Sequence, residues 1–426
     1  VLWSITNLLA AIFTLQFVLG LSFTEAFSPQ VLGTYLLSLA PSRSFFLAAV
    51  LAFLIGFSSA IIRSLNSTLL LLGLAIAAVA TPLLNSHSAS LGDHSLAITS
   101  SVAHGLAITF WVGGLWAIVR DIDDIDVVKR FSTLATWSVS ALLISGLAAT
   151  YARLDSISDL WASGYGRLVV IKSLLLFSIA LIARKIRAQY VRGTSVHRLI
   201  TTELSIMAAA VGFGVALHAS PLSRAAIELP SAAEEVLGFA FPPAPTVTSM
   251  LSGWHPEWTM LTASILALAL YLSGVRRLRV QHIEWSALRT SSFTIGIALV
   301  LWATSSGVSR YAMVSFASHM IQHMMLSMLA PIFLVLGAPI TLALRALPAA
   351  SDSAIRNPRQ WITSLLHSRY ALFIGHPIIV LAIFTFGLYG MYFTPLFGSL
   401  MGSHTGHLFM EVHFLLSGTL FAFIVV

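Results

Sequence analysis

Two histidines four residues apart, in an apolar run whose centre also holds four methionines, are the side chains best suited to metal chemistry in this sequence. The run extends from Tyr311 to Ala338, and its centre reads Ser318-His319-Met320-Ile321-Gln322-His323-Met324-Met325-Leu326-Ser327-Met328. A helix of 3.6 residues per turn places His319 and His323 about 40° apart on one face, where they can address one ion or one neighbouring helix. Imidazole and thioether ligands without a thiolate suit copper better than calcium or magnesium.

Membrane helices must position these side chains. The 426-residue chain is 57% hydrophobic and 9% charged, with a mean hydropathy of +0.90, which excludes an ordinary soluble protein. Apolar runs of about 17 to 25 residues, each able to cross a hydrocarbon core of about 30 Å, recur along the chain. We predict an all-α polytopic integral membrane protein with about twelve transmembrane helices in two bundles, near residues 1–24, 44–62, 68–84, 95–119, 131–151, 167–183, 199–218, 258–275, 291–307, 311–337, 371–393 and 404–426.

The net charge of +7 follows the topology of these helices. If the residue 1 end is cytoplasmic, 17 of the 23 basic residues fall in inner loops and five in outer loops, with Lys172 inside a span. This bias fixes the orientation under the positive-inside rule and argues against nucleic acid as a partner. Ten of the 14 histidines then lie in the outer half or near the midplane, which favours a metal site toward the outer side.

The chain has no cysteine, and therefore neither a disulfide nor a thiolate metal site. It begins with Val1 instead of methionine and ends at Val426 within an apolar run, so we expect further residues beyond both ends. We find no phosphate loop, catalytic triad or paired-carboxylate arrangement and predict no enzymatic activity.

Three motifs of the first half occur in the order and topological positions of a known family. They are His104 to Gly114, then Tyr165-Gly166-Arg167 through Lys172 with Arg184-Lys185-Ile186-Arg187, and Leu217-His218-Ala219-Ser220-Pro221. Together they resemble the CopD family of bacterial copper-resistance membrane proteins over roughly residues 45–225. The resemblance implies copper passage across the inner membrane without an ATPase and a copper site formed by His94, His104 and His218. Lys172 is either a functional intramembrane cation or a side chain that snorkels to the interface or pairs structurally.

The second half resembles another family. Its motifs are His319-Met320-Ile321-Gln322-His323-Met324, then Leu329-Ala330-Pro331 and Gly337 to Arg345, and finally His407-Leu408-Phe409-Met410-Glu411-Val412-His413. They resemble the CtaG family of caa3-type cytochrome c oxidase assembly factors over about residues 250–426. The whole chain is similar to actinobacterial fusions of the two families. We predict a CopD-like domain at 1–225, an outer proline-containing linker at 226–257 and a CtaG-like domain at 258–426 with five visible helices, in a bacterial plasma membrane.

The CtaG-like site that this resemblance implies joins His319 and His323 to His407 and to one or more of Met320, Met324, Met410 and His413. In the last helix His407 and Glu411 share the face of His404, whereas His413 points nearly opposite. Glu411 is either an acceptor that orients a histidine or a proton-carrying carboxylate. The alternative to a metal site is a hydrogen-bonded polar helix interface in which the methionines fill space.

We therefore expect a copper-handling membrane protein that takes copper, as Cu(I), at its outer face. It would support copper delivery to a haem-copper oxidase, copper transport across the membrane, or both, with oxidase subunits or a copper chaperone as partners. Three other interpretations stay open. They are a haem-binding redox subunit with histidines as axial ligands, a proton or ion channel that uses histidine and Glu411, and an assembly scaffold that binds no metal.

Overall fold

A computed structural model describes residues 1–61, 64–85, 94–118, 125–154, 156–191, 202, 205–214, 231–237, 239–348 and 357–426. Every regular element in these ranges is helical, and the one extended pairing among them is an isolated bridge between Trp254 and Ser306. Within a bilayer a helix satisfies its own backbone groups, which the surrounding lipid cannot do. An all-helical fold is the expected result for a chain this apolar.

Ten helices of the described residues are long and apolar enough to span a membrane. The other two predicted segments coincide with shorter apolar helices at Ser205–Gly214 and Pro377–Tyr392. The predicted all-α polytopic membrane fold is confirmed, with twelve as an approximate count. The ten spans are Leu2–Leu19, Ala40–Ile61, Leu65–Leu84, Ser95–Ala117, Val127–Tyr151, Gly164–Lys185, Trp258–Val280, Ala287–Ser305, Phe316–Ala346 and His404–Val425.

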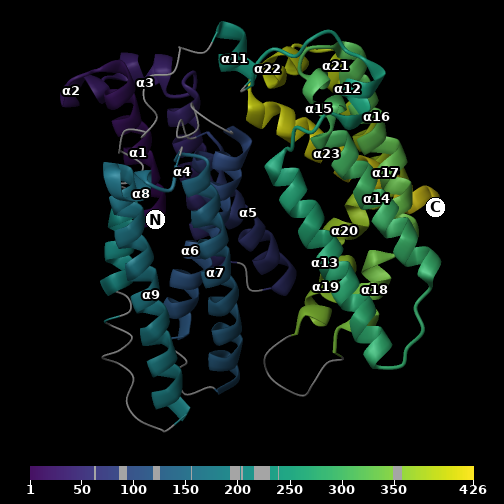
Figure 1. The fold of residues 1–426 in the computed structure, drawn as a ribbon, viewed down its shortest axis with the longest axis horizontal. Coiled ribbons are helices and arrows are strands. Elements are labelled where there is room, and N and C mark those ends of the chain that lie inside the picture. Colours follow the sequence, from purple (N-terminus) through teal and green to yellow (C-terminus); the bar gives the residue numbers. More distant parts are fainter. Residues whose placement is uncertain are drawn as a thin grey trace. The chain divides into compact units, whose positions relative to one another are not determined.

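The chain forms two compact units, residues 1–52 with 76–230 and residues 53–75 with 231–426. In the first, α6 (His94–Ile118), α7 (Ile125–Tyr151) and α9 (Gly164–Val191) are the long helices that run side by side (Figure 1). Their shared core includes Trp111, Leu142 and Ile179. The remaining helices of this half are α1 (Leu2–Leu19), α2 (Phe23–Ala26), α3 (Pro29–Tyr35), α4 (Ala40–Ile61), α5 (Leu65–Leu84) and α8 (Asp159–Ala162).

The second unit is built on α13 (Trp258–Val280), α14 (Ala287–Ser305), α17 (Ala330–Leu336), α21 (Pro377–Tyr392) and α23 (His404–Val425). One apolar cluster, which includes Leu326, Met410 and Phe414, joins α23 to the run that holds the paired histidines. A second, which includes Tyr271, Phe293 and Leu342, joins α13 and α14 to α18 (Pro339–Ala346). The shorter elements are α11 (Ala232–Leu237), α12 (Val247–Ser252), α15 (Gly307–Ala312), α18 (Pro339–Ala346), α19 (Pro358–Leu366), α20 (Arg369–Ile374) and α22 (Leu396–Met401).

The predicted helix at 311–337 is not a single regular α-helix. α15 ends at Ala312, α16 runs over Phe316–Met324, a π-helical turn (η2) covers Met325–Leu329, and α17 follows. Pro331 has no backbone N–H to donate to the carbonyl four residues earlier, and its ring would clash with that carbonyl in a regular α-helix. A local widening of the helix relieves this clash. π-Helical turns of this kind frequently lie beside functional sites.

Part of the predicted linker at 226–257 is packed structure. It contains α11 and α12, and the Ser249 hydroxyl accepts a hydrogen bond of 3.0 Å from the Tyr311 hydroxyl. Arg310 donates to the Ala240 carbonyl at 3.1 Å. A Cβ on Gly307 would overlap the Ser249 carbonyl oxygen, so glycine at this position allows α12 and α15 to touch.

Candidate metal centre

Three buried histidines from two helices meet in the second unit. His319 and His323 lie on α16 and His407 on α23, and one ring nitrogen from each lies within 4.8 Å of the other two. The ring centroids are 4.2 Å apart for the α16 pair, 5.6 Å for His319 and His407, and 6.0 Å for His323 and His407. All three side chains are buried.

Close helix packing brings α23 to this position. A Cβ on Gly418 would overlap the Ser327 carbonyl oxygen, so only glycine lets the α23 backbone approach the π-helical turn this closely. Gly406 makes a similar approach to the Leu400 carbonyl of α22. The Ser403 hydroxyl caps α23 by accepting from the Gly406 amide at 3.1 Å. His407 is therefore held in the first turns of a fixed helix.

The ring nitrogens of this cluster lack hydrogen-bond partners. Neither nitrogen of His319 or His323, nor Nε2 of His407, forms a hydrogen bond of good geometry, although the Ala312 backbone lies within reach of the His319 ring. A buried polar atom without a partner costs about 1–3 kcal/mol, and such atoms are rare in folded proteins. Five of them around one point fit an ion that uses the imidazole lone pairs.

The dimensions also fit a single ion after a small adjustment. Two imidazole nitrogens that each lie about 2.0 Å from one metal are at most about 4 Å apart. The observed spacing of up to 4.8 Å therefore requires the rings to approach by about 1 Å, which side-chain rotation can supply. Three neutral imidazoles suit copper, zinc, iron or nickel.

A buried carboxylate and amide lie beside the histidines. Glu411, 1% exposed, accepts a hydrogen bond of 2.6 Å at Oε1 from Nε2 of Gln322, which also donates to the Ala303 carbonyl at 3.1 Å. The same Oε1 lies 3.6 Å from Nδ1 of His407. A carboxylate here favours the tautomer in which Nδ1 carries the proton and Nε2 is the free ligand.

Gln322 and Glu257 are polar residues of this region that sequence reasoning did not assign. The sequence does contain a signal for Gln322, because it is a polar residue inside an apolar run. Glu257 directly precedes a span, where its Oε1 accepts from the Thr259 amide at 3.0 Å. Its Oε2 pairs with Nε2 of His404 at 3.1 Å. The pair lies at the N-terminal ends of α13 and α23, one helical turn before His407.

Aromatic rings surround the histidines. The ring centroid of Phe414 lies 4.4 Å from that of His323, and the ring of Phe397 lies 5.2 Å from His319. Tyr392 is 6.0 Å and 6.5 Å from the two α16 histidines. These rings keep the site in a medium of low dielectric, where charge–ligand interactions are strong.

The other predicted ligands of this half lie in different surroundings. Met410 is fully buried in the apolar cluster with Leu326 and Phe414. Met320 and Met324 are half-buried, and the helical period turns them about 80° and 120° from the midline of the two histidines. His413 is not part of the three-histidine cluster and packs against α21, where a Cβ on Gly387 would overlap its Nε2.

The predicted site of the first half contains a different arrangement. Nε2 of His104 lies 3.2 Å from Nζ of Lys172, and its Nδ1 lies 2.9 Å from the Ser145 hydroxyl. An ammonium group only donates, so Nε2 accepts from Lys172 and Nδ1 donates to Ser145. The ligand role of His104 stays a prediction, with Lys172 as competitor for its lone pair. His94 is the first residue of α6, and His218 lies outside the described residues.

Comparison with known proteins separates the two halves. Residues 269–426 match the family model of the cytochrome c oxidase caa3 assembly factor, and residues 125–217 match that of copper resistance protein D. Both resemblances inferred from the sequence are confirmed, and one chain carries both segments.

The chain is also similar to uncharacterized proteins of mycobacteria. It is 39% identical over 185 residues to proteins of Mycobacterium bovis and Mycobacterium tuberculosis, and 39% identical over 186 residues to one of Mycobacterium leprae. Each match covers 43% of this chain and 28% of the relative's length. No solved structure matches the chain significantly.

Proposed function

We propose that this chain, which joins a segment matching copper resistance protein D to one matching the caa3 oxidase assembly factor, binds copper at His319, His323 and His407 and supports copper delivery to a haem-copper oxidase. The two family descriptions suggest copper handling and oxidase assembly. Copper is the cargo in this proposal. No covalent catalysis is involved.

The observation that carries the proposal is the set of unpartnered nitrogens at one buried point. Three imidazoles alone do not select copper over zinc. The description of one matched family, copper resistance protein D, favours copper, and the absence of cysteine leaves imidazole and thioether as the soft ligands of the chain. A site of few ligands suits release of Cu(I) to a partner by ligand exchange.

The Glu257–His404 pair supplies an approach to the site. His404 lies one turn before His407 on α23, and its side chain is 24% exposed whereas Glu257 is nearly buried. A cation that reaches this carboxylate and imidazole has His407 as its next ligand on the same helix face. With the orientation favoured by the basic residues, this approach opens toward the outer side of the membrane.

In the first unit we propose that copper crosses the membrane past the His104–Lys172 pair. Because Lys172 holds the Nε2 lone pair of His104, a cation binds there only after the ammonium moves away or loses its proton. Copper movement through this unit is therefore coupled to the position of Lys172.

A proton path is the second candidate, and Glu411 is the observation that favours it. Its Oε2 is buried without a hydrogen-bond partner, and its Oε1 lies beside His407 and Gln322. Ion conductance by purified protein in copper-free vesicles would support this path. A haem is less compatible, because Phe414 and Phe397 already lie 4.4 Å and 5.2 Å from the histidine rings; a haem absorption band would show it.

The proposal is tested by elemental analysis of the purified chain. We expect the copper content per chain to fall strongly in His319→Ala with His323→Ala, and the copper content of the oxidase to fall in cells that carry this variant. His367→Ala with His376→Ala is the matched control, because both of these side chains are exposed. Wild-type copper content in the first double variant would refute the site, and a metal-free wild-type protein would favour a scaffold.

A further inference from the structure

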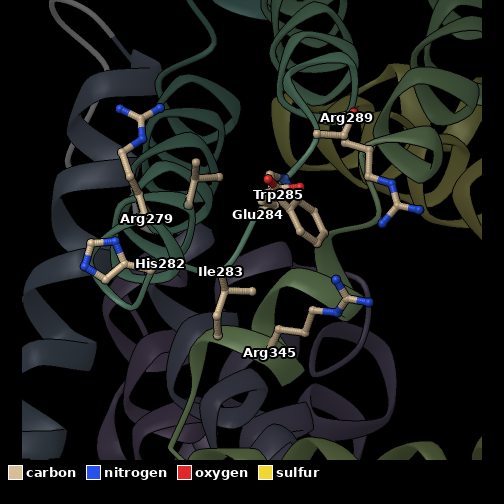
Figure 2. Close-up of a pocket in the computed structure, with 9 residues that line it drawn as sticks. Arg279, His282, Ile283, Glu284, Trp285, Arg289 and Arg345 are labelled. Atoms are coloured by element: carbon tan, nitrogen blue, oxygen red, sulfur yellow. The ribbon is translucent and has the colours of Figure 1, made fainter.

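A basic cavity lies at the end of α13 remote from the histidines. It has a volume of about 700 Å³ and is lined by the C-terminal part of α13, the segment 281–286, the start of α14 and the end of α18. Figure 2 shows Arg289 and Arg345 on one side of Trp285 and Glu284, and Arg279 on the other side with its guanidinium pointing away from them. Nothing in the proposed copper chemistry uses these residues.

The three guanidinium groups are not neutralised. Within the described part of the chain none of them forms an ion pair or a hydrogen bond, and Arg289 only stacks over the Trp285 ring at 5.2 Å. Glu284 is the single carboxylate of the lining, so the lining carries three positive charges and one negative charge. Each guanidinium offers five N–H donors in a planar fork, a geometry that matches phosphate oxygens.

Hydrogen bonds hold the walls of the cavity in place. Nε1 of Trp285 donates to the Tyr271 hydroxyl at 3.2 Å, and that hydroxyl donates to the Gly337 carbonyl at 2.8 Å. Tyr271 also stacks on Phe293 with centroids 4.1 Å apart. These contacts link α13, α14 and the start of α18, so the lining is formed before any ligand binds.

The backbone at His282 is a second, independent feature of this cavity. His282 lies in the left-handed region with φ of 56°, and the Ile283 amide donates to the Leu278 carbonyl at 2.9 Å, as in a helix-ending motif that favours glycine. A non-glycine residue there costs about 1–2 kcal/mol. A residue that lines a cavity and has a strained backbone is a candidate for a functional role.

The position of the cavity along α13 indicates what kind of molecule would carry a phosphate into it. From Glu257 to Arg279 along α13 is about 33 Å at 1.5 Å per residue, close to the thickness of a hydrocarbon core. The cavity is therefore level with lipid headgroups at the membrane face opposite the Glu257–His404 pair. Val280 and Leu288 beside it are 72% and 81% exposed, which suits contact with acyl chains.

We propose that this cavity binds a phosphate group between Arg289 and Arg345, carried by an anionic phospholipid of the adjacent leaflet. Basic pockets between membrane helices bind such headgroups. A free phosphate offers the same oxygens but has no acyl chains. The two ligands are therefore distinguished by whether binding requires a lipid tail. This inference does not depend on the copper site.

The test is native mass spectrometry of the full chain in detergent, titrated with phosphatidylglycerol, phosphatidylcholine or inorganic phosphate. Arg289→Gln with Arg345→Gln removes two lining charges, and Arg276→Gln with Arg277→Gln removes two exposed charges from the same end of α13 that do not line the cavity. We expect phosphatidylglycerol affinity to fall about tenfold or more in the first pair and less than about twofold in the second.

Each result has a definite meaning. Preference for phosphatidylglycerol over phosphatidylcholine that depends on the lining pair supports the lipid site, and His282→Gly should weaken it severalfold while relieving the backbone. Inorganic phosphate could instead bind as tightly as phosphatidylglycerol, with the same dependence on the lining pair. That result would support a phosphate site but would assign it to the free anion and overturn the lipid assignment. Equal binding of the two lipids, or equal losses in both pairs of variants, would overturn the proposal.

Discussion

The rings of His319 and His323 lie one turn apart on α16 with their centroids 4.2 Å from each other and their planes tilted by 32°, and none of their four nitrogens forms a hydrogen bond of good geometry. A hydrogen-bonded polar interface between helices would have satisfied at least some of these atoms. His407 turns the pair into three potential donors around one buried point. This relationship favours an ion over structural pairing, and it makes the following outcomes testable.

The two histidines of α23 should differ in their effect on copper binding. We expect His407→Ala to weaken copper binding at least about tenfold, because it removes one of three clustered nitrogens. His413→Ala is the matched control on the same helix, since its ring packs against Gly387 outside the cluster, and it should change affinity less than about twofold. Competition titration with a Cu(I) chelator measures both. A larger loss in the His413 variant would place the site elsewhere.

Glu411→Gln should weaken copper binding by about 10- to 100-fold while the fold is retained. The substitution keeps the shape of the side chain but removes the negative charge beside Nδ1 of His407, 3.6 Å away, and such supporting acceptors contribute this much to metal affinity. Thermal unfolding checks the fold and chelator competition checks the affinity. An unchanged affinity would show that Glu411 does not orient His407 and would favour its role in a proton path.

Gly418→Ala should destabilise the second unit by about 1–3 kcal/mol. The added methyl group would overlap the Ser327 carbonyl oxygen and push α23 away from the π-helical turn. Gly398→Ala is the control, because no heavy atom lies within 4 Å of its Cβ position. Denaturation in detergent measures the difference, and copper content should fall with the displacement of His407. Equal stability of the two variants would contradict the close packing.

His104 and Lys172 should be energetically coupled. His104→Leu leaves the ammonium of Lys172 without its acceptor and should cost about 1–3 kcal/mol. Adding Lys172→Met removes the stranded charge and should recover much of that loss. A double-mutant cycle of unfolding free energies should give a coupling of about 0.5–3 kcal/mol. A coupling near zero would mean that the 3.2 Å contact contributes little to the folded state.

The parts of the fold and site that follow local periodicity could be predicted from the sequence. The length of each apolar run fixed the membrane segments, and the four-residue spacing placed His319 and His323 on one face. The interruption of the predicted 311–337 helix was harder to predict, because Pro331 signals a disturbance without showing whether the chain kinks or widens into a π-helical turn.

Contacts between distant residues could not be predicted. Glu257 and His404 are 147 positions apart, and His104 and Lys172 are 68 apart. Their pairing depends on how α13 packs near α23 and α6 near α9, which a single sequence does not reveal. Both His104 and Lys172 stood out by residue type, but only the structure shows that Lys172 holds the lone pair expected to bind a metal.

The central claim, that His319, His323 and His407 bind copper together, is tested most directly by X-ray absorption at the copper edge on the Cu(I)-loaded chain. We predict a first shell of imidazole nitrogens at about 2.0 Å, similar to imidazole on zinc, and its loss in His319→Ala with His323→Ala. A first shell of sulfur alone, or an unchanged spectrum in the double variant, would contradict the claim.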